Sequence, residues 1–196
     1  MDSKRLNEIK RILNDSIDVK KEIVADVQLL SIIDQVAIII TQCFEKGGKV
    51  LLCGNGGSAS DAQHIAAEFT GRFYLDREPL FAEALHVNTS FLTAVANDYS
   101  YSEVYSRSVK AKGRRGDVLI GLSTSGNSEN IVKAFEVSKQ LGLITVALTG
   151  QTGGEMKDAD YLINVPSLDT PRIQESHITI GHIICELVEK KIFTND

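Results

Sequence analysis

The sequence predicts an α/β protein: a three-layer αβα sandwich around a parallel sheet, preceded by an N-terminal helical arm. Short, continuous apolar runs bounded by glycine or proline indicate strands that are buried on both faces. These runs alternate with segments whose apolar residues recur at the helical spacing of three and four. Strands that alternate with helices favour a parallel sheet with helices on both faces. The first 47 residues carry only the helical pattern.

The arm, residues 1–47, becomes strongly apolar after Glu22. Its apolar residues recur at helical spacing, at positions Ile23, Val27, Leu30, Ile33, Val36 and Ile40. Further isoleucines widen this stripe until it covers most of the helix surface, and such a helix needs cover on both sides. We expect its own domain to cover one side and a partner subunit to cover the other. Gly47 and Gly48 end the arm.

The remaining elements follow in order along the chain. The strand pattern occurs at residues 49–53, 81–87, 117–121, 143–148 and 161–165. A helix that Ser58 or Ser60 would cap runs to about Phe69, and further helices are predicted at 129–141 and 172–192. The sequence therefore predicts five strands, with the helices needed to cover both faces of their sheet.

Composition limits the class of protein. The 196 residues allow one domain, at roughly 150 residues per domain. The hydrophobic content of 43% and charged content of 24% are typical of a globular chain and exclude disorder as the main state. A net charge of −5 argues against a nucleic-acid partner or an anionic membrane partner. Without a long apolar run or a secretory signal, we expect a cytoplasmic location.

Cysteine usage agrees with a reducing compartment. Cys43, Cys53 and Cys185 are odd in number and far apart, without a Cys-x-x-Cys spacing. The sequence therefore predicts neither a disulfide framework nor a thiolate metal site.

Two loops that follow predicted strands indicate an anion site. Residues 54–60 read Gly-Asn-Gly-Gly-Ser-Ala-Ser, and residues 123–128 read Ser-Thr-Ser-Gly-Asn-Ser. Open parallel sheets bind ligands at the carboxyl ends of their strands, and a helix N-terminus there offers free N–H groups and about half a positive charge. Hydroxyl donors are added by Ser123, Thr124, Ser125 and Ser128. Together these neutral groups predict a phosphate site.

Other interpretations of these loops are weaker. The chain lacks the Gly-x-x-x-x-Gly-Lys-Ser/Thr pattern of a nucleoside-triphosphate P-loop. Gly54, Gly56 and Ala59 superficially match a dinucleotide fingerprint, but Asp76 does not end a second predicted strand. A tight turn that needs glycine dihedrals is an alternative for either loop alone, and much less so for the two together.

Ionisable residues on two predicted helices could meet near these loops. His64 and Glu68 are four positions apart, so they share a helix face. Gln174 and His182 lie eight positions apart on the last helix, about 12 Å along its axis. Two imidazoles and a carboxylate suit either zinc or an acid–base pair. Structural roles are more common for single histidines, and we assign them to His86 and His177.

Four blocks of the sequence resemble one family. Residues 53–69, 96–99, 123–128 and 172–182 occur in order and are similar to the sedoheptulose 7-phosphate isomerases, or phosphoheptose isomerases, of the sugar isomerase (SIS) superfamily. The resemblance covers essentially the whole chain. It implies a SIS-type, flavodoxin-like fold in a single domain, 1–196. It also implies the conversion of sedoheptulose 7-phosphate into D-glycero-D-manno-heptose 7-phosphate through an enediol. This reaction begins bacterial nucleotide-heptose synthesis for lipopolysaccharide or capsule.

The resemblance also implies roles for individual residues. Glu68 would be the base that moves the carbon-bound proton, and His182 the opposing acid–base. The substrate would be bound by Asn55, Gly56, Gly57, Ser58, Asn97, Asp98, Ser123, Thr124, Ser125, Ser128 and Gln174. One zinc ion per subunit would be held by His64, Glu68, Gln174 and His182. Family members are homotetramers, so residues 1–47 would contribute to oligomerisation.

Two departures from the family pattern border the expected sugar site: Ala96 replaces a usual glycine, and Asn88 a usual aspartate. They bring the stereochemistry of the substrate into question. Two alternatives therefore stay open. One is a non-catalytic binding protein like the family's replication initiator-associating member, although that protein has lost catalytic side chains and this chain keeps Glu68 and His182. The other is an isomerase of a shorter sugar phosphate, such as arabinose 5-phosphate.

Overall fold

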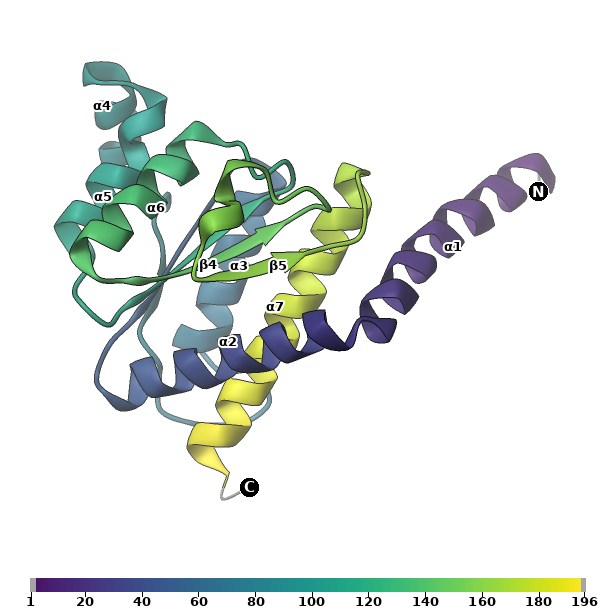
Figure 1. The fold of residues 1–196 in the computed structure, drawn as a ribbon, viewed down its shortest axis with the longest axis horizontal. Coiled ribbons are helices and arrows are strands. Elements are labelled where there is room, and N and C mark those ends of the chain that lie inside the picture. The colour runs from purple at the N-terminus through teal and green to yellow at the C-terminus, as the bar shows by residue number, and fades with distance from the viewer. Residues whose placement is uncertain (1–2, 195–196) are drawn as a thin grey trace.

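Five parallel strands form one sheet at the centre of the protein (Figure 1), whose computed structural model describes residues 3–194. The strands are β1 (Val50–Gly54), β2 (Ala82–Ala84), β3 (Val118–Ser123), β4 (Ile144–Thr149) and β5 (Tyr161–Asn164). Their order in the sheet is β2-β1-β3-β4-β5, and every neighbouring pair is parallel. This is the flavodoxin-like order, in which the direction of winding reverses between β1 and β3. All five predicted strands are confirmed, although β2 is shorter than predicted.

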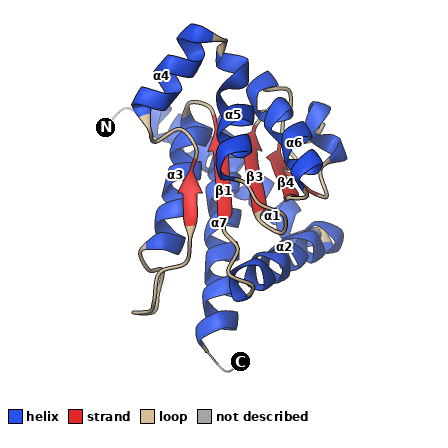
Figure 2. Cartoon of the chain, turned by 90° about the vertical axis from the view of Figure 1, so that its left-hand side faces the viewer, coloured by secondary structure: helices blue, strands red, loops and turns tan. Residues whose placement is uncertain are grey.

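Seven α-helices and two 3-10 helices complete the described chain (Figures 1 and 2). They are α1 (Ser3–Ala25), α2 (Val27–Glu45), α3 (Gly57–Thr70), α4 (Thr89–Asp98), η1 (Tyr101–Glu103), α5 (Val104–Lys112), α6 (Glu129–Leu141), η2 (Gly154–Asp158) and α7 (Thr170–Phe193). One apolar core lies between the sheet and α2, α3 and α7, and a second lies between the sheet and α5 and α6. The predicted three-layer sandwich is confirmed.

Strand β1 shows why these runs are continuously apolar. Val50 and Leu52 point into the first core, whereas Leu51 and Cys53 point into the second. Successive side chains of a strand face opposite sides of the sheet. Because helices cover both sides, every residue of β1 is buried, and the alternating pattern of a half-exposed strand is absent from it.

The predicted N-terminal helical arm is confirmed, and it consists of two helices whose boundary the sequence pattern did not locate. Asp26 ends α1 and caps α2, since its carboxylate accepts the N–H groups of Gln28 and Leu29, both at 3.0 Å. The first helix, α1, extends away from the sheet (Figure 1) and buries only Ile23. It touches the body where Arg172 of α7 donates to the carbonyl of Ile12 at 2.9 Å. Residues 1–2 of the predicted arm and 195–196 of the predicted domain lie outside the described residues.

Other local predictions were wrong. Neither Ser58 nor Ser60 caps α3: the helix begins at Gly57, and its N-cap is Gly56, whose φ of 55° is one that glycine tolerates. Helices α4 and α5 were not predicted, because each is only about three turns long and carries a mixed apolar pattern.

Among the described helices, α2 is the one that is long and apolar enough to cross a membrane, with a mean hydropathy of 1.7. It packs against α7 and β5, and seven of its residues are buried. A helix between a sheet and its neighbours needs the same composition, so this packing accounts for its hydropathy.

A buried carboxylate organises the amino-terminal edge of the sheet. Asp117, 2% exposed, accepts hydrogen bonds from the backbone N–H groups of Lys49 at 3.1 Å and Arg114 at 2.8 Å. It also pairs with the Lys49 ammonium at 2.6 Å. Asp117 thereby ties the start of β1 to the start of β3.

His177 ties α7 to the sheet, in agreement with the structural role predicted for it. Its ring is fully buried, and Nε2 lies 3.1 Å from the carbonyl oxygen of Thr149 on β4. Within residues 3–194, Nδ1 has no hydrogen-bond partner. Burial lowers the pKa of His177 to about 4, against an ordinary value of 6.5, because a buried imidazolium loses its hydration.

This burial predicts a pH-dependent stability. The unfolded chain binds a proton at His177 near pH 6.5 and the folded chain only near pH 4, so the folded state loses stability as the pH falls through this window. We expect the free energy of unfolding to fall by about 2 to 3 kcal/mol from this residue between pH 7.5 and pH 4.5. Urea unfolding of wild type and His177→Gln at both pH values measures it. Equal pH dependence in the two proteins would contradict the assignment.

Candidate active site

The two glycine- and serine-rich loops lie side by side at the reversal point of the sheet. Strands β1 and β3 pair directly, with Gly54 opposite Leu122, so the loops that follow them leave the same edge. Gly54 has no room for a side chain, because a Cβ there would collide with the backbone of Ser58. This close approach holds the first turn of α3 against the end of β1. The N-termini of α3 and α6 therefore open at one place, as predicted.

The second loop surrounds a cavity with hydroxyl and amide groups. The hydroxyls of Ser123 and Ser128 lie 2.9 Å apart, and that of Ser125 accepts the N–H of Asn127 at 3.1 Å. Beside them is a cavity of about 260 Å³, lined by Thr124, Ser125, Asn127, Gln151, Thr152, Leu168 and Thr170. Its lining contains no charged side chain, so neutral donors and the α6 N-terminus are available for an anion. The isolated positions of Gln151, Thr152 and Thr170 gave no sequence signal.

Asn55 is held in place by two residues that the sequence analysis missed. Its amide exchanges two hydrogen bonds of 2.9 Å with the amide of Asn130, which is 3% exposed and lies in the first turn of α6. The hydroxyl of Tyr101 donates to Asn55 Oδ1 at 3.0 Å. These bonds join the first loop to the helix that follows the second loop.

Asn97 and Asp98 lie at the C-terminal end of α4, which contacts η1. Both side chains are exposed, and Asn97 Nδ2 donates to Asp98 Oδ1 at 3.0 Å.

The two departures from the family pattern have local explanations. Asn88 caps α4 by accepting the N–H of Phe91 at 3.0 Å, as an aspartate would, and Ala96 packs against the second core.

Three predicted side chains from α3 and α7 converge. His64 Nε2 lies 3.0 Å from Glu68 Oε1, and His182 Nε2 lies 3.4 Å from His64 Nε2. The donor atoms of all three residues lie within 4.8 Å of one another. The two imidazole rings meet edge to face, with centroids 5.0 Å apart. Residues separated by 118 positions thus form one cluster with solvent access, since the His64 side chain is half exposed.

A glycine allows α3 and α7 to approach closely at this cluster. A Cβ on Gly181 would lie 2.5 Å from the Cδ1 atom of Ile65. Gly181 directly precedes His182, and Ile65 directly follows His64. The missing side chain therefore brings the two histidines together.

Gln174, the fourth predicted metal ligand, lies beside Gly57 of the first loop. A Cβ on Gly57 would be 2.8 Å from Gln174 Nε2, so glycine at position 57 makes room for this amide. Gln174 thus stands where α7 meets the start of α3, eight positions before His182 on α7.

The chemistry of this arrangement follows from its groups. A carboxylate and two imidazoles can exchange protons with a bound ligand, and the same donor set fits a zinc ion. The cysteines take no part, because Cys43, Cys53 and Cys185 are buried free thiols and burial raises the pKa of each.

The doubly wound sheet with a serine-rich loop at its reversal point defines the class of the protein, and a profile of the SIS domain matches residues 14–150. The chain is 57% identical to a phosphoheptose isomerase from Aneurinibacillus thermoaerophilus over 95% of both chains. It is 53% identical to one from Clostridium acetobutylicum over 95% of this chain and 96% of the other. A solved phosphoheptose isomerase from Neisseria gonorrhoeae is 43% identical, with a TM-score of 0.88 over 94% of this chain and 98% of its own. The chain belongs to the phosphoheptose isomerase family of SIS-domain proteins.

The second loop provides a test of anion binding. Gly126 has a φ of 69°, and a Cβ there would collide with the carbonyl of Gly153. Gly116 has a φ of 88° but no atom within 4 Å of such a Cβ. Gly116→Ala should therefore lower the free energy of unfolding by about 1 to 2 kcal/mol, the cost of a left-handed backbone alone.

Gly126→Ala should lose more stability than Gly116→Ala, because the collision displaces the loop. It should also weaken binding of inorganic phosphate about tenfold or more, since the hydroxyls and N–H groups of the loop move apart. Urea unfolding and calorimetric titration with phosphate measure the two effects. Unchanged phosphate affinity in Gly126→Ala would show that the anion binds elsewhere.

Proposed function

We propose that this protein isomerises sedoheptulose 7-phosphate to D-glycero-D-manno-heptose 7-phosphate, the first step of bacterial nucleotide-heptose synthesis for lipopolysaccharide or capsule. The observation that carries the proposal is the convergence of His64, Glu68 and His182 between α7 and the helix that follows the first loop, α3, in a chain of this family. The three side chains come from two helices, α3 and α7, that are far apart in the sequence. We place the reaction in the cytoplasm, with no nucleic-acid or membrane partner.

The phosphate end of the substrate would bind at the second loop. The hydroxyls of Ser123, Thr124, Ser125 and Ser128 and the N-terminus of α6 provide hydrogen-bond donors without a cationic side chain. The sugar would extend from there across the first loop. Its hydroxyls would meet Asn55, Gly56, Gly57, Ser58, Asn97, Asp98 and Gln174. A substrate fixed at its phosphate would hold C1 and C2 at one position. Binding would then also orient the reacting carbons.

The reaction itself moves two protons. Glu68 would take the proton from C1 of the ketose, which leaves an enediol, and would return it to C2 to form the aldose. His182 would move the other proton between O1 and O2. Each positioned group of this kind contributes about 10²- to 10⁴-fold to the rate. His64, 3.0 Å from Glu68, orients the carboxylate.

We further propose one zinc ion per subunit, held by His64, Glu68, Gln174 and His182. Two imidazole nitrogens and a carboxylate oxygen within 4.8 Å are the donor set that zinc prefers. Gln174, beside Gly57, would contribute its amide oxygen from the side of the first loop. When bound, zinc polarises a carbonyl and stabilises an adjacent negative charge. A carboxylate that binds zinc is a weaker base, so Glu68 would serve as ligand and as base at different moments.

An observation favours the proposal over the first alternative, and an experiment separates it from the second. A non-catalytic binding protein has no need for an ionisable cluster, whereas Glu68 and His182 lie together here. A five-carbon isomerase is tested by competition between arabinose 5-phosphate and sedoheptulose 7-phosphate for the purified protein.

Glu68→Gln should abolish turnover, because an amide cannot accept the carbon-bound proton, and we expect a loss of about 10²- to 10⁴-fold in kcat. Aldose formation from sedoheptulose 7-phosphate measures it, with metal-free and zinc-loaded protein assayed in parallel. Glu186→Gln is the control, since Glu186 on α7 pairs with Lys190 at the surface. Absence of turnover in wild type, with and without zinc, would instead favour the binding protein.

We also infer that the protein is a homotetramer in which residues 1–47 hold subunits together. In its own chain α1 buries only Ile23, and it exposes apolar side chains at Leu6, Ile9, Ile12, Leu13, Ile17 and Val24. A helix stripe of this kind is favourable in water only when another surface covers it.

The double substitution Ile9→Lys and Leu13→Lys should therefore reduce the assembly. Two lysines in a buried apolar contact lose hydration without gaining partners, so we expect species smaller than the wild type at micromolar concentration. Sedimentation velocity measures the mass. Leu141→Lys, at a partly exposed leucine on α6, is the control and should leave it unchanged. A monomeric wild type would contradict the inference.

A further inference from the structure

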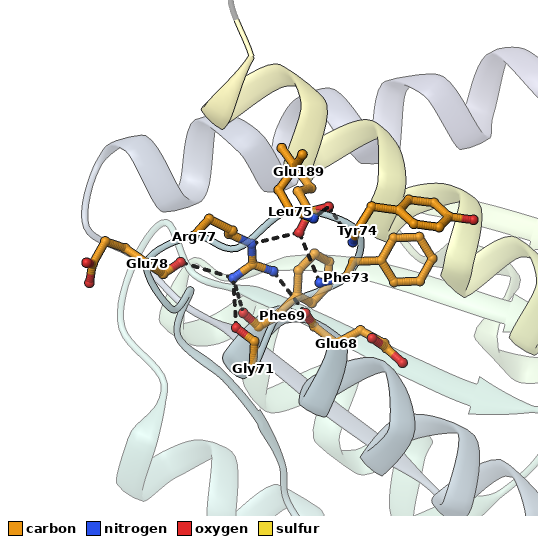
Figure 3. Close-up of polar contacts among 9 residues, drawn as sticks. All are labelled: Glu68, Phe69, Gly71, Phe73, Tyr74, Leu75, Arg77, Glu78 and Glu189. Carbon is orange, nitrogen blue, oxygen red and sulfur yellow. Dashed lines mark hydrogen bonds and ion pairs between the residues drawn. The ribbon is translucent and has the colours of Figure 1, made fainter.

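A buried carboxylate on α7 holds the segment that follows α3 (Figure 3). Glu189 is 2% exposed, and its two oxygens accept four hydrogen bonds. Three come from consecutive backbone N–H groups, of Phe73 at 3.0 Å, Tyr74 at 2.7 Å and Leu75 at 3.0 Å. The fourth comes from Nε of Arg77 at 2.9 Å. Glu189 thus binds a stretch of backbone that lies 114 to 116 positions away in the sequence.

Arg77 extends this contact to the end of α3. Its terminal nitrogens donate to the carbonyl oxygens of Glu68 at 2.9 Å and Phe69 at 2.7 Å, and Figure 3 shows these bonds beside the pair with Glu189. The last carbonyl groups of a helix lack partners within the helix and attract a cation. Arg77 therefore binds the backbone of the residue that we identify as the base, and joins that backbone to α7.

The same segment places an aromatic ring against His182, the proposed acid–base opposite Glu68. The ring of Phe73 packs on the imidazole of His182, with centroids 5.7 Å apart and a tilt of 38°. His182 and Glu189 lie seven positions apart, so they occupy the same face of α7. Glu189 binds the N–H of Phe73 at one point of this face, and the side chain of Phe73 covers His182 at the other.

Glu189 is ionised under ordinary conditions. Burial raises its pKa, but the N–H groups of Leu75, Phe73 and Tyr74 together with Arg77 outweigh burial and hold the pKa below the usual value. A buried charge with four donors is far more rigid than a surface ion pair. Such rigidity matters where a displacement of about 1 Å costs activity.

We propose that Glu189, Arg77 and Phe73 are positioning residues for isomerisation, which fix α3 against α7 and keep Glu68 and His182 in reacting geometry. The inference rests on the proposed function. None of the three is required to touch the substrate: Arg77 acts through the backbone of Glu68, Phe73 through the ring of His182, and Glu189 through both.

The matched control is Asp117, which has similar chemistry but joins the starts of β1 and β3 instead of α3 and α7. It is also buried. It also accepts hydrogen bonds from backbone N–H groups and forms an ion pair with a cation. Glu189→Gln and Asp117→Asn each replace a buried carboxylate by an amide of nearly equal size. Both should lower the melting temperature, because each leaves a buried cation with a poorer partner.

The two variants should differ in catalysis. We expect Glu189→Gln to lower kcat by about 10- to 100-fold while the KM for sedoheptulose 7-phosphate changes less than about threefold, because the phosphate loop is untouched. Asp117→Asn should keep kcat within about twofold of wild type. Phe73→Ala should lower kcat, and Phe73→Tyr, which keeps the ring, should restore it. All assays use protein verified as folded by circular dichroism.

The possible results separate this inference from the proposed function. A wild type that turns over while Glu189→Gln and Phe73→Ala keep full kcat would overturn the positioning role and leave the function intact. A wild type without turnover would overturn the function, and a crystal structure of Glu189→Gln then tests positioning directly. In it the ring of Phe73 should have left His182. An unchanged Phe73, with His64 and His182 still at 3.4 Å, would refute the inference.

Discussion

The close packing of α3 against α7 is the contact on which the candidate site depends. His64 and Glu68 occupy one face of α3, and the third member of their cluster comes from α7. The counterpart, His182, reaches them because Gly181 lets Ile65 fill the space that a side chain would take. Any larger residue at 181 would push the helices apart by part of a side-chain diameter, which is comparable to the length of the contacts that define the cluster.

The parallel sheet complements this contact by bringing the two loops to one end of the sheet. Pairing of β1 with β3 places the two loops next to each other, and the Asn55–Asn130 bonds join the first loop to the helix after the second. In the proposed function, hydroxyls and backbone N–H groups of the second loop would bind the phosphate without a charged side chain.

Local patterns in the sequence were sufficient for the parts of the fold that local physics decides. The runs at 49–53 and 117–121 predicted buried strands because both faces of the sheet are covered. His64 and Glu68 were found together because a four-residue spacing puts them on one helix face. The cap at Asp26 was missed because the apolar stripe continues across it. Helices α4 and α5 were missed because neither is long enough to establish a period.

Contacts between distant segments could not be predicted in the same way. Glu189 has the sequence context of an ordinary polar residue near the end of a helix, and Arg77 that of a loop residue. Their roles depend on a fold that brings positions more than a hundred residues apart into contact. Asn130 is similar, because nothing distinguishes it from a helix residue until Asn55 lies opposite.

Glu189 and Asp117 show that similar buried carboxylates can have different roles. Each is a buried carboxylate that gathers backbone N–H groups and a cation, and each contributes to stability for the same physical reason. Their surroundings differ. Asp117 joins two strand ends at the amino edge of the sheet, away from both loops, whereas Glu189 joins the helix that carries Glu68 to the helix that carries His182. A buried ion pair affects function when it joins the elements that carry the reacting groups. The rigidity that stabilises the fold then also fixes the geometry of the site.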